Sequence, residues 1–401
     1  TATVNRLQAM ARRTLLNNLV GIPTDCPHRE KQGWTADGYF TSAAAMYNFD
    51  MSQFYIKWMR DLAATQAPSG ALCTVAPSVG YDEGVSISWP VALTVVPGEL
   101  YDFYGEHRLL SELYPAMLRF ASHARTHELP DAPEMVAEVL GDWVSPADSI
   151  LPTLKGSSIL APPEGVNTYG ASSYYALLRG LCRYAHITGN DADSTLLLPW
   201  ARRIRSTFND RFLHPAEAAY FGHIPTLYRL APNAVALMEG LVPDTLSLAV
   251  GNRLRSALAD DSFKARTGFL GTRALMKWLP LHDPEAAWAL ATQPAYPGWG
   301  YMVAQGATTM WEDWAACASV DHLPYALISE YFFRHLAGIS LSHSPSDEAD
   351  ATSAATGAHR PALLIAPSFV KALSHASATY RSLYAVSYTH LRAHETRHDL
   401  V

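Results

Sequence analysis

The sequence has few features of a membrane, nucleic-acid-binding or structural-zinc protein. Its 401 residues include only four cysteines, which are scattered and form no CxxC pair, whereas a structural zinc site needs closely spaced ligands. No run of eighteen or more apolar residues occurs, so no segment is predicted to span a membrane. Acidic residues outnumber basic ones, 37 to 30, and no basic stripe is present, so we expect no nucleic-acid partner.

Helical periodicity dominates residues 1–340. Apolar residues recur at helical spacing between residues 6 and 20, and Gly21 and Pro23 then break the pattern. Only short hairpins are expected, near residues 71–80 and 220–230. About a dozen helices of this kind suit an all-α fold, an (α/α)6 barrel, whose loops at one end of the ring build the site. The other helices are predicted at residues 36–48, 51–65, 86–105, 107–127, 170–188, 191–210, 231–240, 246–259, 280–292 and 321–338.

The character of the sequence changes after this helical region. Residues 341–358 are rich in Ser, Ala and Asp, which is typical of a linker or flexible loop. Residues 359–386 contain two expected strands, 362–365 and 377–384, and two strands cannot bury a core alone. We interpret this region as the start of a truncated β domain. Residues 387–401 lack an apolar period and resemble a translated sequencing-adapter tail, so a non-native tail is predicted there.

Polar and aromatic residues are densest in residues 25–37, DCPHREKQGWTAD, a loop between two expected helices. Pro27 and Gly33 indicate a specified backbone path. The tryptophan ring can stack on a sugar, while the carboxylates can accept hydrogen bonds from its hydroxyls. These features favour a carbohydrate site, although a solvated turn is the alternative that composition leaves open.

A second cluster spans residues 296–314, YPGWGYMVAQGATTMWEDW, in which Glu312 lies between two tryptophans. A helix start capped by a threonine would explain the same residues, and such a cap would also fix the carboxylate. Asp142, Trp143 and the isolated Trp89 are weaker candidates, because single tryptophans are more often core residues. Two carboxylates from distant loops, with aromatic walls, fit glycoside hydrolysis.

The first cluster resembles the DCPxRExxGWxGD loop of the glycoside hydrolase family 78 α-L-rhamnosidases, and the second resembles that family's SWGYMxxxGATTxWExW segment. The segments GDW at 141–143 and RTGFLGTR at 266–273 resemble further family segments, in the family's order. The resemblance covers residues 5–340. It implies an (α/α)6 barrel, inversion at the anomeric carbon, and a β-sandwich after the barrel, of which only a truncated start is expected here.

The resemblance also implies roles for the matching residues. Glu30 is expected to be the general acid and Glu312 the general base that activates water, with carboxyl groups about 6.5–9.5 Å apart. It implies no metal ion and no cofactor. The residues expected to bind the sugar, with two tryptophans as a wall around the C6 methyl, are Asp25, Arg29, Trp34, Asp37, Trp89, Asp142, Trp143, Trp299 and His322.

The sequence departs from the family pattern at three places. Ala36 replaces the usual glycine of the first motif. Some members carry one more residue in this loop, which shifts the acid by one position, but Lys31 occupies that position here and leaves Glu30 as the candidate carboxylate. Asp321 stands before His322 where the family has asparagine, and the loop between the second motif and this histidine is shorter than usual.

The expected function is hydrolysis of terminal α-L-rhamnosyl residues of glycosides or polysaccharides. A bacterial origin is expected. Because the sequence begins at Thr1 and not at Met, we interpret the chain as a fragment or a processed product. One alternative is another (α/α)6 glycosidase of the glucoamylase, trehalase or arabinofuranosidase type. A second is a non-catalytic carbohydrate-binding fragment. A third, a polysaccharide lyase, is disfavoured because the carboxylates of the first loop would repel an anionic sugar. The compartment, aglycone and oligomeric state stay open.

Overall fold

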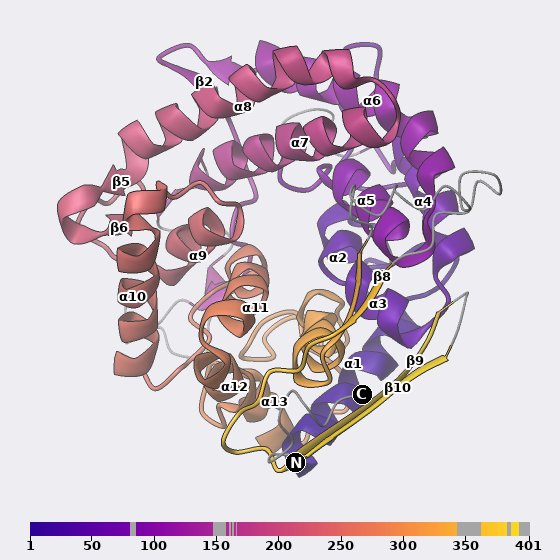
Figure 1. The fold of residues 1–401 in the computed structure, drawn as a ribbon, viewed down its shortest axis with the longest axis vertical. Coiled ribbons are helices and arrows are strands. Elements are labelled where there is room, and N and C mark those ends of the chain that lie inside the picture. Colours follow the sequence, from indigo (N-terminus) through magenta and orange to yellow (C-terminus); the bar gives the residue numbers. More distant parts are fainter. Residues whose placement is uncertain are drawn as a thin grey trace.

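Helical hairpins form a closed ring in the computed structural model (Figure 1). The structure describes residues 1–80, 86–146, 158–159, 162, 164–165, 167–342, 362–382 and 386–392. Each hairpin pairs an outer helix with an inner helix, and successive hairpins follow one another around the ring. This is the all-α (α/α)6 barrel that the sequence predicts.

The outer helices bury only one face. In α10, for example, the buried residues Val250, Gly251, Leu254 and Leu258 recur at helical spacing and form one stripe. The opposite face is exposed to solvent, so the helical spacing of the apolar residues can be recognised in the sequence. The outer helices are α1 (Ala2–Asn17), α4 (Ser52–Ala64), α6 (His107–Thr126), α8 (Asp191–Phe212), α10 (Asp244–Asp260) and α12 (Pro284–Thr292).

The inner helices are buried on nearly every side. In α9, all residues from Leu230 to Leu237 are buried. Their side chains join one continuous apolar core with the inward stripes of the outer helices, and burial of that area is the main stabilising term. The inner elements are α2 (Thr35–Phe40), α3 (Ser42–Asn48), α5 (Ala92–Tyr104), α7 (Asn167–Ile187), α9 (Leu230–Met238), α11 (Phe269–His282), η4 (Pro324–Leu327), α14 (Ile328–Tyr331) and η5 (Phe332–Leu336).

Two helices have no counterpart in the sequence-based expectation. The helix α11 begins at Phe269, well before the predicted range 280–292, and α13 (Trp299–Ala304) lies in a segment interpreted as a loop. Nearly every residue of α11 from Phe269 to Pro280 is buried, so the alternation between apolar and polar faces that marks a helix is missing. The range 321–338 divides into three short helical elements.

The short strands lie between and after the helices. β5 (Leu213–His214) pairs with β6 (Ala219–Tyr220), just before the hairpin expected at 220–230. Residues 71–80 contain isolated bridge residues, among them Val75, which pairs with Trp34. The remaining short strands before residue 200 pair as β1 with β2 and β3 with β4. Their bounds are Glu128–Leu129, Ala132–Val136, Ser145–Pro146 and Ser158–Ile159.

After the ring, the described residues form two antiparallel two-stranded sheets. β7 (Ile339–Ser342) pairs with β8 (Ala362–Ile365), which coincides with a predicted strand. β9 (His375–Arg381) pairs with β10 (Val386–Arg392), so residues 387–392 form a strand where a non-native tail was expected. Most of the predicted linker 341–358 lies outside the described residues.

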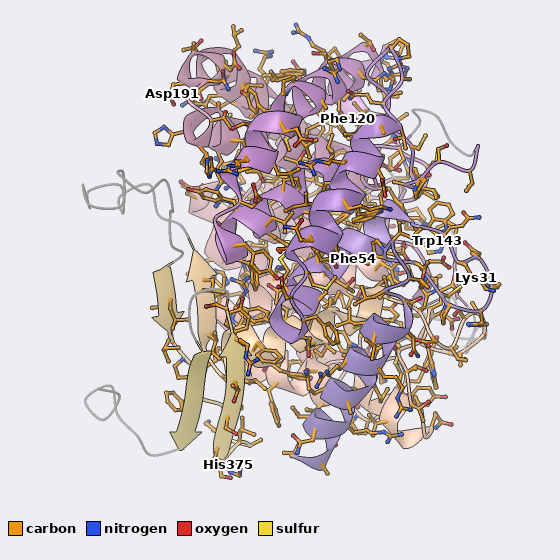
Figure 2. The ribbon with its side chains drawn as sticks, turned by 90° about the vertical axis from the view of Figure 1, so that its right-hand side faces the viewer. Lys31, Phe54, Phe120, Trp143, Asp191 and His375 are labelled. Carbon is orange, nitrogen blue, oxygen red and sulfur yellow. The ribbon has the colours of Figure 1, made fainter. Side chains whose placement is uncertain are left out.

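The two ends of the ring differ. Loops that carry Lys31 and Trp143 lie at one end, and the strands that follow the ring, with His375, lie at the other (Figure 2). Among the described helices, none is both long enough and apolar enough to cross a membrane.

Candidate active site

A pocket of about 570 Å³ opens between loops at the end of the ring that carries Trp143 (Figure 2). Its lining combines charged groups with aromatic and aliphatic side chains, as expected of a site for a small, partly apolar ligand. The lining residues are Arg29, Glu30, Trp34, Asp37, Trp89, Leu140, Trp143, Val144, Phe269, Glu312, Asp313, Cys317, Ala318 and His322.

The loop 25–37 follows α1 and leads into α2, and its backbone is held at several points. The Asp25 N–H donates to the Gln32 carbonyl at 2.9 Å, and the Asp25 carbonyl accepts from the Leu323 N–H at 3.1 Å. Gly33 packs so closely that a Cβ there would lie 2.1 Å from the carbonyl oxygen of Ala76. The prediction of a specified backbone therefore has a steric basis, because the loop and the segment beside it leave no space for a side chain.

Arg29 joins the two carboxylates that the sequence singles out. Its Nη2 lies 3.0 Å from Glu30 Oε1 and 2.8 Å from Glu312 Oε2. The second oxygen of Glu30 accepts a hydrogen bond from Trp34 Nε1 at 2.7 Å. Loops almost three hundred positions apart thus meet at one guanidinium.

The two carboxylates approach each other through one oxygen each. Because one nitrogen makes both contacts, Glu30 Oε1 and Glu312 Oε2 lie at most 5.8 Å apart, the sum of 3.0 and 2.8 Å. This limit concerns one oxygen of each group, so the separation of about 6.5–9.5 Å between the carboxyl groups stays a prediction. Arg29 sets the approach, because it binds one oxygen of each carboxylate.

Glu312 is buried, and its own segment holds it. Its N–H donates to the Ser319 carbonyl at 2.7 Å, and its Oε2 accepts from the Ser319 N–H at 3.0 Å. The alternative of a helix start does not apply, because residues 307–322 form turns rather than a helix. Trp311 and Trp314, which flank Glu312, pack outside the pocket lining, with Trp314 stacked on Tyr325.

Asp313 organises the same segment and was not predicted as a site residue. Its carboxylate accepts from the N–H groups of Ala315 at 2.7 Å, Cys317 at 3.0 Å and Ala318 at 2.9 Å. Ala316 adopts φ 58° inside this turn, a left-handed conformation that costs alanine free energy. The only signal in the sequence is an acidic residue beside Glu312, because the ring of N–H donors forms only when the chain folds.

His322 lies among three carboxylates. Its Nε2 is 3.0 Å from Asp37 Oδ1, and its Nδ1 is 3.8 Å from Glu312 Oε2 and 3.9 Å from Asp25 Oδ2. Burial opposes the charged ring, but Asp37, Cys26 and Glu312 outweigh it and raise the pKa of His322 to about 10. The imidazole is therefore protonated at neutral pH and balances part of the negative charge.

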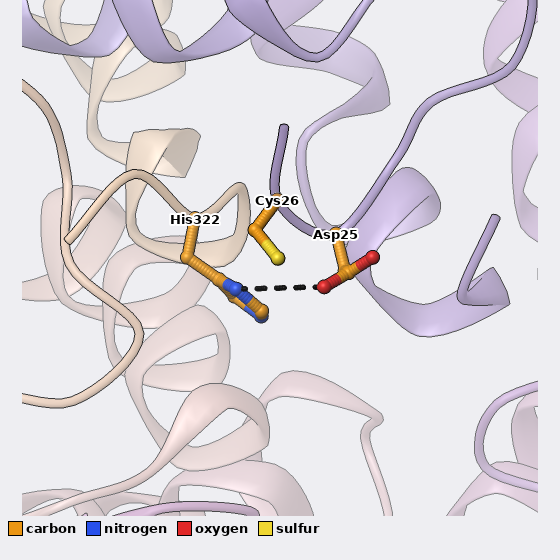
Figure 3. A group of neighbouring side chains, drawn as sticks. All are labelled: Asp25, Cys26 and His322. Carbon is orange, nitrogen blue, oxygen red and sulfur yellow. Dashed lines mark ion pairs between the residues drawn. The ribbon is translucent and has the colours of Figure 1, made fainter. Parts of the chain in front are cut away.

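Asp25 and Cys26 come together with His322 from a distant part of the chain (Figure 3). Each of the three offers a ligand-type atom, and these atoms lie within 4.8 Å of one another. Burial, followed by repulsion from Asp37, raises the pKa of Asp25. These are the residues that could hold a metal ion beside the pocket.

The apolar part of the pocket comes from separate elements. Trp89 precedes α5, Trp143 lies just before β3, and Phe269 is the first residue of α11. The Phe269 ring stacks on His322 with centroids 5.9 Å apart, so this wall borders the charged cluster. Leu140 and Val144 complete it, and the sequence offered no reason to choose these two aliphatic residues.

The predicted ligand Asp142 has a different place. It is completely buried, and its two oxygens accept from the N–H groups of Gly268 at 2.7 Å and Gly271 at 2.8 Å, at the start of α11. Burial, with Glu164 nearby, raises the pKa of Asp142 to about 7. It holds the helix that presents Phe269 to the pocket.

The chain matches the sequence profile of the bacterial alpha-L-rhamnosidase six-hairpin glycosidase domain over residues 1–336. The chain belongs to this family. The resemblance inferred from the two motifs is therefore confirmed. The fold of the ring agrees with the six-hairpin description of the family.

Individual relatives support the same family. An alpha-L-rhamnosidase of Streptomyces avermitilis is 29% identical over 337 residues, which are 80% of this chain and 30% of that protein. One from Formosa agariphila is 25% identical over 389 residues, 89% of this chain and 39% of that protein. The chain thus spans 30–39% of the length of these relatives.

Solved rhamnosidase structures share the fold. The alpha-L-rhamnosidase from Dictyoglumus thermophilum superposes with a TM-score of 0.86 at 25% identity, covering 99% of this chain and 42% of that chain. The Streptomyces avermitilis enzyme, complexed with L-rhamnose, superposes with a TM-score of 0.82 at 24% identity, covering 98% and 36%.

The predicted site residues of this rhamnosidase-family domain divide into two groups. Asp25, Asp142 and Trp299 lie behind the pocket surface, where Trp299 is completely buried and donates from Nε1 to the Tyr325 carbonyl at 3.0 Å. Each of these three has 0% of its surface exposed in this structure, and their contact with sugar stays a prediction. The predicted residues that line the pocket are Arg29, Glu30, Trp34, Asp37, Trp89, Trp143, Glu312 and His322.

Proposed function

We propose that this domain hydrolyses terminal α-L-rhamnosyl residues of glycosides or polysaccharides. The observation that carries the proposal is the meeting of Glu30 and Glu312 at one aromatic-walled pocket in a chain of the rhamnosidase family. The relatives named alpha-L-rhamnosidase and the neighbour complexed with L-rhamnose support this substrate class.

The proposed general acid is Glu30, which lies at the rim of the pocket and is partly exposed. A carboxyl group at the rim can reach the glycosidic oxygen while the leaving group stays in solvent. Trp34 Nε1 holds one oxygen of Glu30 at 2.7 Å and so orients the other. In the proposed step Glu30 gives its proton to the leaving oxygen as the glycosidic bond breaks.

The proposed general base is Glu312. Arg29 and the Ser319 N–H both bind its Oε2, and among the described residues no hydrogen bond to Oε1 is made. A water bound to Oε1 would lose a proton to Glu312 as its oxygen attacks the anomeric carbon. Two donors on the other oxygen fix the direction in which Oε1 accepts that proton.

The proposed sugar subsite has a polar and an apolar side. Asp37 and His322 provide the polar side, and Trp89, Trp143 and Phe269 provide the apolar side. Rhamnose carries a methyl group at C6, so an apolar wall favours it over a sugar with a C6 hydroxyl, whose polar group would lose hydrogen bonds with water. The pocket therefore suits a deoxy sugar.

We infer inversion from the family resemblance rather than from the carboxylate separation. A sugar ring that enters between Glu30 and Glu312 would replace the contacts both make with Arg29 Nη2, and the two side chains could then move apart. The configuration of the first-formed product decides the matter: β-L-rhamnose from an α-L-rhamnoside, followed by proton NMR before mutarotation, supports inversion. First-formed α-L-rhamnose would contradict it.

The assignment of acid and base is tested with two variants and two leaving groups. Glu30→Gln should lower kcat by about two to four orders of magnitude on an alkyl rhamnoside, the range of one general acid. Its loss should be much smaller on a dinitrophenyl rhamnoside, whose leaving group needs little protonation. Glu312→Ala should lose activity on both substrates, because attack by water limits each reaction.

A substrate panel separates this function from its alternatives. Purified chain is assayed on nitrophenyl α-L-rhamnoside, α-D-glucoside and α-L-arabinofuranoside, beside calorimetry with free L-rhamnose. Hydrolysis of the rhamnoside alone is the expected result. Preference for another glycoside would refute the rhamnosidase function, and rhamnose binding without turnover would identify a carbohydrate-binding fragment.

A further inference from the structure

We propose that Asp25, Cys26 and His322 form a binding site for a divalent cation of the zinc class, and that its occupation inhibits hydrolysis. The sequence alone predicts no metal, because the three ligands are not closely spaced along the chain. Folding brings Cys26 and Asp25 from the loop after α1 to His322, which precedes η4 (Figure 3).

The geometry suits a small coordination sphere. The three ligand atoms lie within 4.8 Å of one another, and Asp25 Oδ2 is 3.9 Å from His322 Nδ1. Zinc bonds to sulfur, nitrogen and oxygen of 2.0–2.3 Å in a tetrahedron place ligand atoms about 3.3–3.8 Å apart. The longest separation between ligand atoms therefore needs to shrink by about 1.0–1.5 Å on metal binding.

Two of the ligand atoms are buried without a nitrogen or oxygen partner, among the described residues, that meets hydrogen-bond geometry. These atoms are Asp25 Oδ2 and His322 Nδ1, and the Cys26 side chain is a neighbour that influences the pKa of both residues. Both side chains are at least nine-tenths buried. A buried polar atom without a partner costs free energy. A cation between these two atoms and the Cys26 sulfur would recover that cost, and its binding would release the protons of His322 Nδ1 and of the Cys26 thiol to solvent.

In two of the three ligands, Asp25 and His322, the atom opposite the ligand atom is already held. His322 Nε2 lies 3.0 Å from Asp37 Oδ1, the carboxylate contact that orients metal-binding histidines in many proteins. Asp25 Oδ1 accepts from the Gln32 N–H at 2.8 Å, and the Glu30 N–H lies 3.4 Å from the Cys26 sulfur. These contacts leave Asp25 Oδ2 and His322 Nδ1 turned toward the same space.

The ligand set selects the class of cation. A thiolate and an imidazole favour zinc and its neighbours, such as cobalt, over magnesium or calcium, which prefer oxygen ligands alone. The carboxylates of Asp25, Asp37 and Glu312 surround His322 and attract a cation. His322 also lines the open pocket, so the ion has a route from solvent.

Inhibition follows from the position of Glu312, and this part rests on the proposed hydrolase function. Its Oε2 is 3.8 Å from His322 Nδ1, so it is near enough to become the fourth ligand of a metal on that nitrogen. A base carboxylate bound to zinc is a poorer proton acceptor. The metal would also take His322 away from its role beside the sugar.

Binding is tested without an activity assay. Cobalt(II), which reports thiolate ligation through a charge-transfer absorption band, is titrated into metal-free chain, and zinc is then added to displace it. The expected result is one equivalent of cobalt with a thiolate band. The chain has 16 histidines, so cobalt can also bind elsewhere. Cobalt that binds without this band is not evidence for the proposed site. Absence of the band in the unaltered chain overturns the proposal.

Cysteine variants assign the thiolate. A chain with C73S, C182S and C317S keeps only Cys26 and should retain the band. C26S should lose it and bind zinc at least about tenfold more weakly, the lower end of the effect of losing even an orienting partner. A band that persists in C26S and disappears in C317S would assign the metal to the exposed cysteine of the pocket and overturn the proposal.

The inhibitory part is tested separately. Rhamnoside hydrolysis is measured after chelator treatment and with stepwise zinc, and zinc should lower kcat with an inhibition constant equal to the zinc Kd derived from the cobalt displacement. If hydrolysis is absent even after chelation, the proposed function is contradicted, and the metal site is then tested by the absorption band alone. Hydrolysis that continues unchanged with the site filled contradicts the inhibitory role alone.

Discussion

Replacing Asp313 with alanine should loosen the segment that presents Glu312 to the pocket. The Asp313 carboxylate accepts from three backbone N–H groups between residues 315 and 318, and the segment closes on Glu312 through the paired bonds with Ser319. Asp313→Ala removes all three acceptor contacts at once. The turn at Ala316, with φ 58°, then loses the contacts that hold it.

The size of the effect follows from these bonds. A hydrogen bond to a charged group contributes about 1.5–3 kcal/mol, but residues 315–318 are partly exposed, so water replaces much of what is lost. We therefore expect the free energy of unfolding to fall by about 2 kcal/mol. A displacement of about 1 Å in a catalytic group costs roughly 10²-fold in rate, so kcat should fall by about two orders of magnitude.

Steady-state kinetics and thermal unfolding test this together. The expected pattern is a lower kcat with KM changed by less than about threefold, because Asp313 acts through the position of Glu312. Asp313→Asn keeps one acceptor oxygen, so its kcat should lie between that of the unaltered chain and that of Asp313→Ala. Asp210→Ala, on the exposed face of α8, is the matched control and should leave kcat unaltered. A kcat for Asp313→Ala within twofold of the unaltered chain would refute the reasoning.

Three further predictions concern the loop and the charged cluster. Gly33→Ala would place its Cβ 2.1 Å from the Ala76 carbonyl oxygen and should lower the free energy of unfolding in denaturant by about 1–3 kcal/mol; unchanged stability would contradict the close packing. Trp34→Phe removes the 2.7 Å bond to Glu30 and should reduce kcat about tenfold on an alkyl rhamnoside, with little change in Tm. Because the pKa of His322 is raised from 6.5 to about 10, its stabilising proton is fully present below pH 6.5 and is lost as the pH rises through about 10; Tm should fall over this window, and less so in H322Q.

Sequence patterns predicted most of the helices, including the buried inner helix α9, expected at 231–240, and were most accurate for outer helices whose two faces differ. Outer helices such as α6 and α8 have one apolar stripe and a solvent face, so their period is readable and their ranges agree with the expectation to within a few residues. The helix α11 is apolar on nearly every side and carries no such period. The end of the predicted range 280–292 coincides with α12 instead.

The candidate site was predictable where a long motif named its residues. Glu30 and Glu312 stand in two specific segments, and both reach the pocket. Asp142 also stands in a family-like segment, but its partners Gly268 and Gly271 lie more than 120 positions away. Nothing near Asp142 in the sequence distinguishes a carboxylate that binds sugar from one that holds the start of a helix.

The sequence by itself determined the class of fold, the family and the two carboxylates proposed as acid and base, because periodicity and motif are local properties that the residues carry with them. Only the tertiary structure decided which polar groups face the pocket, that Arg29 bridges Glu30 and Glu312, and that Asp25, Cys26 and His322 converge. Those facts depend on distances between loops far apart along the chain, and such distances are set by the packing of the helical ring.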